Sequence, residues 1–297
     1  MSQVAEPLVN LSRDVAGDLK HRKNVSFLSD AELAALRLAY TKVMQIADDR
    51  GYQYWAGIHG LPLPISCKHS PENGYDSLFL PWHRAYLYFF EKALQDQVPG
   101  VTLPWWDWAS AESHTEGIPA AYAVPNLDGS PNPLHQGPIT AIPKSQWDAF
   151  RQALTEQGQP DPGDLPTVTV RDPDDPANLP AQAFVSQLTD RTTGPSTFKD
   201  FSQIVEVQLH NNVHGWVGGF MTDIPVAAYD PIFWAHHCMV DRLWWLWQLN
   251  HPGVVDLDPG FLSTALDPFP KVTVADLLNI NDLGYDYAVA EVLVPGA

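Results

Sequence analysis

Apolar side chains recur every three or four positions across residues 28–49, which predicts an amphipathic helix. Ser29 or Asp30 can cap the start of this helix, and Glu32 falls in its first turn. The next stretch, residues 52–77, is interrupted by several glycines and prolines. We therefore expect it to be mostly loop.

Three later segments also have a helical pattern. Residues 79–94 are apolar on almost every side, and Pro81 suits a first helical turn, so we expect a buried helix there. Residues 196–216 and 233–249 are interpreted as two further helices. Residues 272–287 alternate weakly and predict a peripheral strand.

Residues 111–194 differ in composition, with dense proline, aspartate and glycine. This composition predicts long loops with short strands, or a helix near residues 145–157. The residue types of the first part resume after residue 194, so we expect one domain over residues 1–297 rather than a linker between two domains.

The charge and the termini restrict the class of protein. A formal net charge of -18, with only 17 Lys and Arg, argues against nucleic acid and anionic membranes as partners. No apolar run reaches the roughly 18 residues that a membrane span needs. Residues 1–7 lack the basic and apolar parts of a signal peptide, so we expect a cytoplasmic protein. Two cysteines, Cys67 and Cys238, can form at most one bridge.

Histidines are the candidate chemistry of the chain. Seven of the 11 fall into two groups, which are His59, His69 and His83, and then His210, His214, His236 and His237. His210 and His214 stand four apart on a predicted helix, so both imidazoles can point at one spot. Burying so many imidazoles without partners is costly, and a shared metal centre explains them together.

The ligand types favour copper. A di-iron carboxylate bundle needs inward-pointing glutamates, and here Glu206 is the only acid near the second group. A di-zinc hydrolase generally needs a bridging carboxylate or a water-activating base, and we expect none to be placed between the two histidine groups in space. Two all-imidazole sites leave open positions that face each other, which suits two copper ions with O₂ as co-substrate.

The chain resembles the type 3 copper proteins, which include tyrosinases, catechol oxidases and molluscan haemocyanin units. The resemblance rests on Phe-Leu-Pro-Trp-His-Arg at residues 79–84 and Asp-Pro-Ile-Phe-Trp at residues 230–234, with further landmarks at residues 103–108 and 285–287. It implies a mainly α fold in which a central four-helix bundle holds a dicopper site. Long loops and a few short peripheral strands are expected outside the bundle.

The resemblance assigns three histidines to each ion, which are His59, His69 and His83 for copper A, and His210, His214 and His237 for copper B. His236 is then a neighbour rather than a ligand.

A covalent bond is also implied at the first group. Cys67 precedes His69 by two residues, the Cys-x-His arrangement that carries a thioether in fungal tyrosinases and molluscan units. A free buried cysteine is the alternative. The segment between His69 and His83 is longer than is usual in the family.

Four more residues match positions that act on the substrate in the family. Glu206 and Asn211 would fix a water that accepts the phenol proton. Ile224 resembles the gate position over copper A. Gly215 offers no side chain to hold a substrate carboxylate, so we expect uncharged phenols to react better than tyrosine.

The implied function is oxidation of o-diphenols to o-quinones with O₂, together with hydroxylation of monophenols. An o-aminophenol oxidase of a biosynthetic pathway is the alternative, and a haemocyanin-like oxygen carrier is less favoured. A small phenol is the expected substrate, and a copper chaperone is a candidate partner. The chain shows no covering C-terminal domain, so we expect the site to be open as made. The sequence does not predict the oligomeric state.

Overall fold

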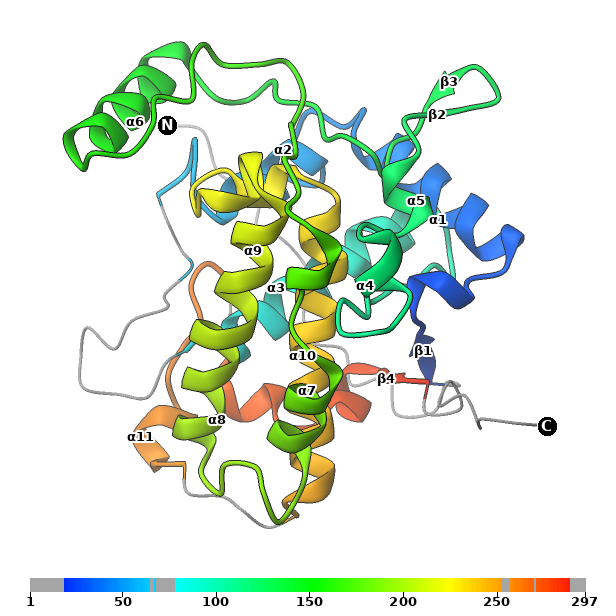
Figure 1. Cartoon of the computed structure of the whole chain (residues 1–297), viewed down its shortest axis with the longest axis vertical. Helices are drawn as coiled ribbons and strands as arrows, with labels where there is room; N and C mark the ends of the chain where they lie inside the picture. The colour runs from blue at the N-terminus through cyan, green and yellow to red at the C-terminus, as the bar shows by residue number, and fades with distance from the viewer. Residues whose placement is uncertain (1–18, 65–66, 68–77, 253–256, 270, 289–297) are drawn as a thin grey trace.

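Two long helices, α3 (Phe79–Gln97) and α10 (Ile232–Asn250), pack against each other at the centre of the fold (Figure 1). The computed structural model describes residues 19–64, 67, 78–252, 257–269 and 271–288. A third helical segment lies beside α10 and consists of α8 (Phe198–Ile204), the π-helix η3 (Val205–His210) and α9 (Asn211–Val217). Helix α2 (Tyr52–Ile58) completes the set, which confirms the predicted mainly α fold with a four-helix centre.

Helix α3 is buried because its apolar residues occupy every side. Every residue of α3 from Phe79 to Phe90 is buried, and Pro81 lies in the first turn as predicted. The buried set includes the charged residues Arg84 and Glu91. A buried charge must be paired, so partners have to come from neighbouring elements.

Those partners form a buried ionic cluster between α3, α10 and the two ends of the described chain. Arg84 Nε donates to Asp241 Oδ1 at 2.5 Å, and Arg22 Nε donates to Glu91 Oε2 at 3.0 Å. The Tyr287 hydroxyl donates to Asp241 Oδ2 at 2.6 Å. Strand β1 (Lys20–Arg22) pairs in parallel with β4 (Tyr285–Tyr287), which brings these side chains together.

Helix α1 (Asp30–Val43) begins with the capping signal that the sequence predicts. Ser29 is the N-cap, and its hydroxyl accepts from the backbone N–H of Glu32. The Glu32 carboxylate accepts in return from the backbone N–H of Ser29 at 2.8 Å. This reciprocal pair satisfies two donors that the first turn leaves open.

Two sequence predictions were wrong in part. Residues 52–58 form helix α2 instead of loop, since the glycines and prolines that interrupt the segment come mostly after it. Residues 272–287 form a strand only at β4. The rest of this tail makes the 3₁₀ turns η6 (Val274–Leu277) and η7 (Ile280–Leu283), whose apolar side chains are buried instead of peripheral.

The remaining elements surround the four central helices. The surrounding elements are α4 (Ser113–Glu116), α5 (Ala120–Ala123), β2 (Asn126–Leu127), β3 (Ser130–Pro131), α6 (Lys144–Glu156), α7 (Gln182–Thr189) and α11 (Pro259–Leu262). The proline-rich middle contains the helix expected near residues 145–157, which is α6, and its short strands β2 and β3 pair antiparallel. Short 3₁₀ turns lie at η1 (Val25–Phe27), η2 (Pro176–Asn178), η4 (Gly219–Thr222) and η5 (Ala227–Tyr229). Among the described residues, no helix is both long and apolar enough to cross a membrane.

Candidate metal centre

The four central helices bring six histidines together, five of them predicted ligands. They are His59 at the end of α2, His83 in α3, His210 at the end of η3, His214 in α9, and His236 and His237 in α10. His214 is partly exposed and the others are buried. The predicted ligand His69 lies outside the described residues.

The first group contains a thiol as well as imidazoles. His59, Cys67 and His83 each offer a ligand atom, and these atoms lie within 4.8 Å of one another. Cys67 Sγ lies 3.5 Å from His83 Nε2. The structure therefore places Cys67 beside the nitrogen of His83 that faces the site. The thioether to His69 stays a prediction, while Cys67 and Cys238 form no disulfide with each other.

The second group contains four imidazoles. One ligand atom from each of His210, His214, His236 and His237 lies within 4.8 Å of the others. Nε2 of His214 and Nε2 of His237 are 3.3 Å apart. Several lone pairs that converge at this spacing fit one shared cation.

The two groups face each other across one pair of stacked rings. The imidazoles of His83 and His237 have centroids 4.2 Å apart and planes inclined by 14°. Phe79 and Phe233 pack edge-on against these groups, with centroids 4.9 Å from His83 and from His59 respectively. The interior between the groups is therefore walled by aromatic side chains.

Main-chain carbonyls orient three of the imidazoles. His59 Nδ1 donates to the Ile224 carbonyl at 2.7 Å, and His83 Nδ1 donates to the Phe79 carbonyl at 2.8 Å. His214 Nδ1 donates to the Met221 carbonyl at 2.6 Å. With the proton on Nδ1, the lone pair of a neutral imidazole lies on Nε2 and is available to a metal. No pattern of side chains in the sequence could have revealed these carbonyls.

Asn211 orients the fourth imidazole. His210 Nδ1 lies 2.9 Å from Asn211 Oδ1, although Asn211 itself is exposed. The predicted substrate residue Asn211 thus holds a histidine in place through its amide oxygen.

Burial keeps the central rings neutral. Desolvation, followed by the nearby His83, lowers the pKa of His237 far below its ordinary value. A neutral imidazole is the form that binds a metal. His237 Nδ1 is buried and has no hydrogen-bond partner in the described part of the chain. This donor set of neutral nitrogens fits copper.

Glu206 and Ile224 lie at the edge of the first group. Burial raises the pKa of the Cys67 thiol, and the nearby Glu206 carboxylate raises it further. Glu206 is half-buried in η3, one turn before His210. Ile224 has a side chain that is 49% exposed, while its carbonyl holds His59.

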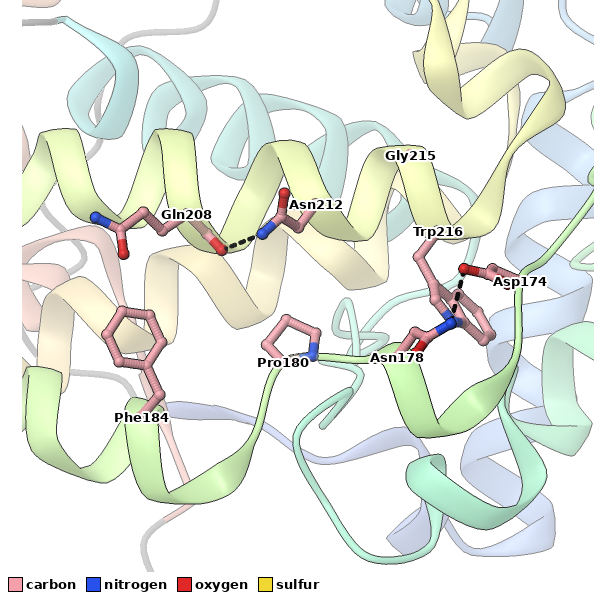
Figure 2. Close-up of a pocket in the computed structure, with 8 residues that line it drawn as sticks. All are labelled: Asp174, Asn178, Pro180, Phe184, Gln208, Asn212, Gly215 and Trp216. Carbon is pink, nitrogen blue, oxygen red and sulfur yellow. Dashed lines mark hydrogen bonds between the residues drawn. The ribbon is translucent and has the colours of Figure 1, made fainter.

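Gly215 faces a pocket on another side of helix α9 (Figure 2). The pocket has a volume of 680 Å³ and lies between α9 and the segment of Pro180 and Phe184. Its lining residues include none of the six described histidines. A Cβ added to Gly215 would meet no atom within 4 Å, so this position is open to a side chain.

Comparison with known proteins agrees with this geometry. The family model for the common central domain of tyrosinase matches residues 49–250. A grixazone synthase of Streptomyces griseus is 32% identical over 246 residues, which cover 68% of this chain and 77% of that protein. A tyrosinase of Streptomyces lincolnensis is 32% identical over 229 residues, covering 68% and 76%.

Haemocyanins also match. The structure of a functional unit of octopus haemocyanin has a TM-score of 0.66 and 26% identity, and covers 90% of this chain and 68% of that unit. The chain spans only 7% of a haemocyanin polypeptide of Enteroctopus dofleini and 37% of one of Sepia officinalis. The matched domain and the paired histidine groups together show that the chain belongs to the tyrosinase family of type 3 copper proteins, whose cofactor is two copper ions.

Proposed function

We propose that the protein is a polyphenol oxidase, which oxidises o-diphenols to o-quinones with O₂ and also hydroxylates monophenols. The observation that carries the proposal is the pair of imidazole groups that face each other across the stacked rings of His83 and His237. Two diphenols lose four electrons and four protons to one O₂, which gives two o-quinones and two waters. Two copper ions, when bound, supply this redox chemistry.

The ligands follow from the two groups. His59 and His83, with the predicted His69, would hold copper A. His210, His214 and His237 would hold copper B. Each described ligand except His237 has its Nδ1 atom engaged by an oxygen, so the protein fixes the ring orientations before the ions arrive.

The chain itself would handle the proton of the substrate. Glu206 is half-buried near Cys67, and the side-chain amide of Asn211 lies beside His210. A carboxylate and an amide at this edge can hold one water, which takes the phenol proton and passes it to Glu206. The phenolate that results is the better electron donor.

An apolar side chain at the same edge suits an aromatic ring. The side chain of Ile224 is 49% exposed, and its carbonyl oxygen accepts a hydrogen bond from His59. A phenol ring that packs on this side chain would have its hydroxyl group close to the first histidine group.

An o-aminophenol oxidase is the second candidate. The Streptomyces griseus relative is named a grixazone synthase, and its match covers most of both chains. An o-aminophenol carries an amine where a diphenol carries its second hydroxyl, so the same two imidazole groups could serve either substrate class. The water held at Glu206 would then accept a proton from nitrogen.

The full-length protein, loaded with copper, would be tested for O₂ uptake with a monophenol, an o-diphenol and an o-aminophenol in parallel. Copper per chain is measured on the same sample. We expect about two copper ions per chain and turnover of the diphenol. Faster turnover of the aminophenol would favour the second candidate, while reversible O₂ binding without any turnover would exclude both and indicate a carrier.

A further inference from the structure

His236 is a buried imidazole whose ring nitrogens are not used by the protein. It has no exposed surface, and neither nitrogen has a hydrogen-bond partner in the described part of the chain. Leaving such polar atoms unpaired in a protein interior costs free energy. A neutral imidazole always has one nitrogen with a lone pair, which a metal ion can take up.

The position of His236 directs this lone pair into the second histidine group. Its ring stacks on that of His210 with a centroid distance of 5.3 Å and an interplanar angle of 19°. The ring of His214 lies 4.9 Å away. One nitrogen of His236 lies within 4.8 Å of the ligand atoms of His210, His214 and His237.

We propose that His236 is a fourth imidazole donor for copper B, and that it binds this ion while the copper A position is empty. The inference rests on the copper ligands assigned in the proposed function and does not depend on which phenol is oxidised. Nitrogens bound tetrahedrally at 2.0–2.1 Å lie about 3.4 Å apart. Because the ligand atoms here lie up to 4.8 Å apart, the side chains would have to move by about 1 Å to bind one ion together.

The number of donors decides whether the ion is reactive. A site with four protein ligands is closed, whereas a site with three keeps a position for water or substrate. A protein with copper B alone would hold its ion closed through His236. Once the copper A position is filled, release by His236 would open copper B toward the first group, and a half-loaded protein would be protected from side reactions with O₂.

The test isolates copper B in the full-length His83→Ala variant, to which one equivalent of Cu²⁺ is added. Pulsed electron paramagnetic resonance counts the imidazole nitrogens bound to the ion, and competition with a chelator gives its affinity. We expect four nitrogens. In His83→Ala/His236→Phe we expect three nitrogens, and an affinity lower by at least about tenfold.

A matched control is available on the same helix. His251 is also buried at the end of α10, but its Nδ1 donates to the Trp247 carbonyl and it belongs to neither histidine group. His83→Ala/His251→Phe should keep four nitrogens and the full affinity. Should the Phe variant fail to fold, His83→Ala/His236→Gly with added isotopically labelled imidazole should regain a fourth, labelled nitrogen.

Three bound nitrogens in the His83→Ala variant, with the same affinity after replacement of His236, would overturn the inference and leave the proposed function intact. No copper binding by the unmodified protein would instead remove the proposed function, and the inference with it.

Discussion

Arg84 donates a hydrogen bond to Asp241 at 2.5 Å. Arg84 follows His83 directly on α3, and Asp241 lies one helical turn after His237 on α10. An ion pair within one helical turn of the two stacked imidazoles thus joins the helices that carry them. Both side chains are buried, so the pair is not screened by solvent. The distance between α3 and α10, and with it the separation of the two histidine groups, depends on this contact.

Replacing Asp241 with Asn should strongly destabilise the fold. The substitution leaves Arg84 and Arg22 buried without their shared carboxylate, which costs about 3–5 kcal/mol. Urea unfolding of the two proteins measures the difference. Asp148→Asn breaks an exposed pair with Lys144 and should change the stability by less than about 1 kcal/mol. Equal effects of the two variants would contradict the structural role of Asp241.

The same carboxylate should make the fold sensitive to acid. Burial works to raise the pKa of Asp241, but Arg84, Arg22 and the Tyr287 hydroxyl lower it overall. A carboxyl group with a lowered folded pKa contributes stability above its unfolded pKa of about 3.9. That contribution is lost as the pH falls through the folded value. The unfolding free energy of Asp241→Asn should therefore fall less between about pH 5 and pH 2 than that of the unmodified protein.

His83→Ala should remove one copper position and leave the other. The His83 ring belongs to the first group and also stacks on His237. Without it, we expect about one copper ion per chain instead of two, and loss of diphenol turnover. Metal analysis and O₂ uptake provide the two measurements. His251→Asn, away from both groups, should keep both ions. Retention of two ions by His83→Ala would show that copper A does not need this ring.

The fold and the ligand histidines were largely predictable because they depend on patterns in the sequence. A long segment that is apolar on almost every side, with Pro81 in its first turn, located α3, and the apolar residues of 233–249 located α10. The spacing of His210 and His214 indicated that they share a helix face. The orientation of the rings was not predictable, because it depends on the carbonyls of Phe79, Met221 and Ile224 and every residue has such a carbonyl. Helix α2 was missed since it is short and followed by loop residues.

Asn211→Ala should reduce copper binding as well as catalysis. The change removes the oxygen that holds His210 Nδ1, and loss of such a contact typically lowers metal affinity or activity by about 10–100-fold. Chelator competition and monophenol turnover would be measured together. Asn212→Ala is the matched control, because Asn212 is also exposed but donates to the Gln208 carbonyl. If both variants lost copper equally, His210 would not depend on Asn211.

Gly215 offers a test of substrate charge. Gly215→Ala should stabilise the protein by about 0.5–1 kcal/mol, because the added Cβ meets no atom and alanine favours a helix. Gly215→Arg should leave the turnover of tyrosine relative to its decarboxylated analogue unchanged within about twofold, because Gly215 lines a pocket that contains none of the six described histidines. Gly215→Gln, which is similar in shape but uncharged, is the control. A higher ratio in the Arg variant alone would show that the substrate carboxylate reaches this pocket.

Ile224 performs two tasks with separate parts of one residue. Its main-chain carbonyl fixes His59, while its side chain is half-exposed at the edge of the site. A change of side chain leaves the carbonyl in place. We therefore expect that exchanging this side chain changes which phenols are accepted without disturbing the metal. A directed-evolution library at this position should be rich in folded, copper-loaded members with altered substrate preference.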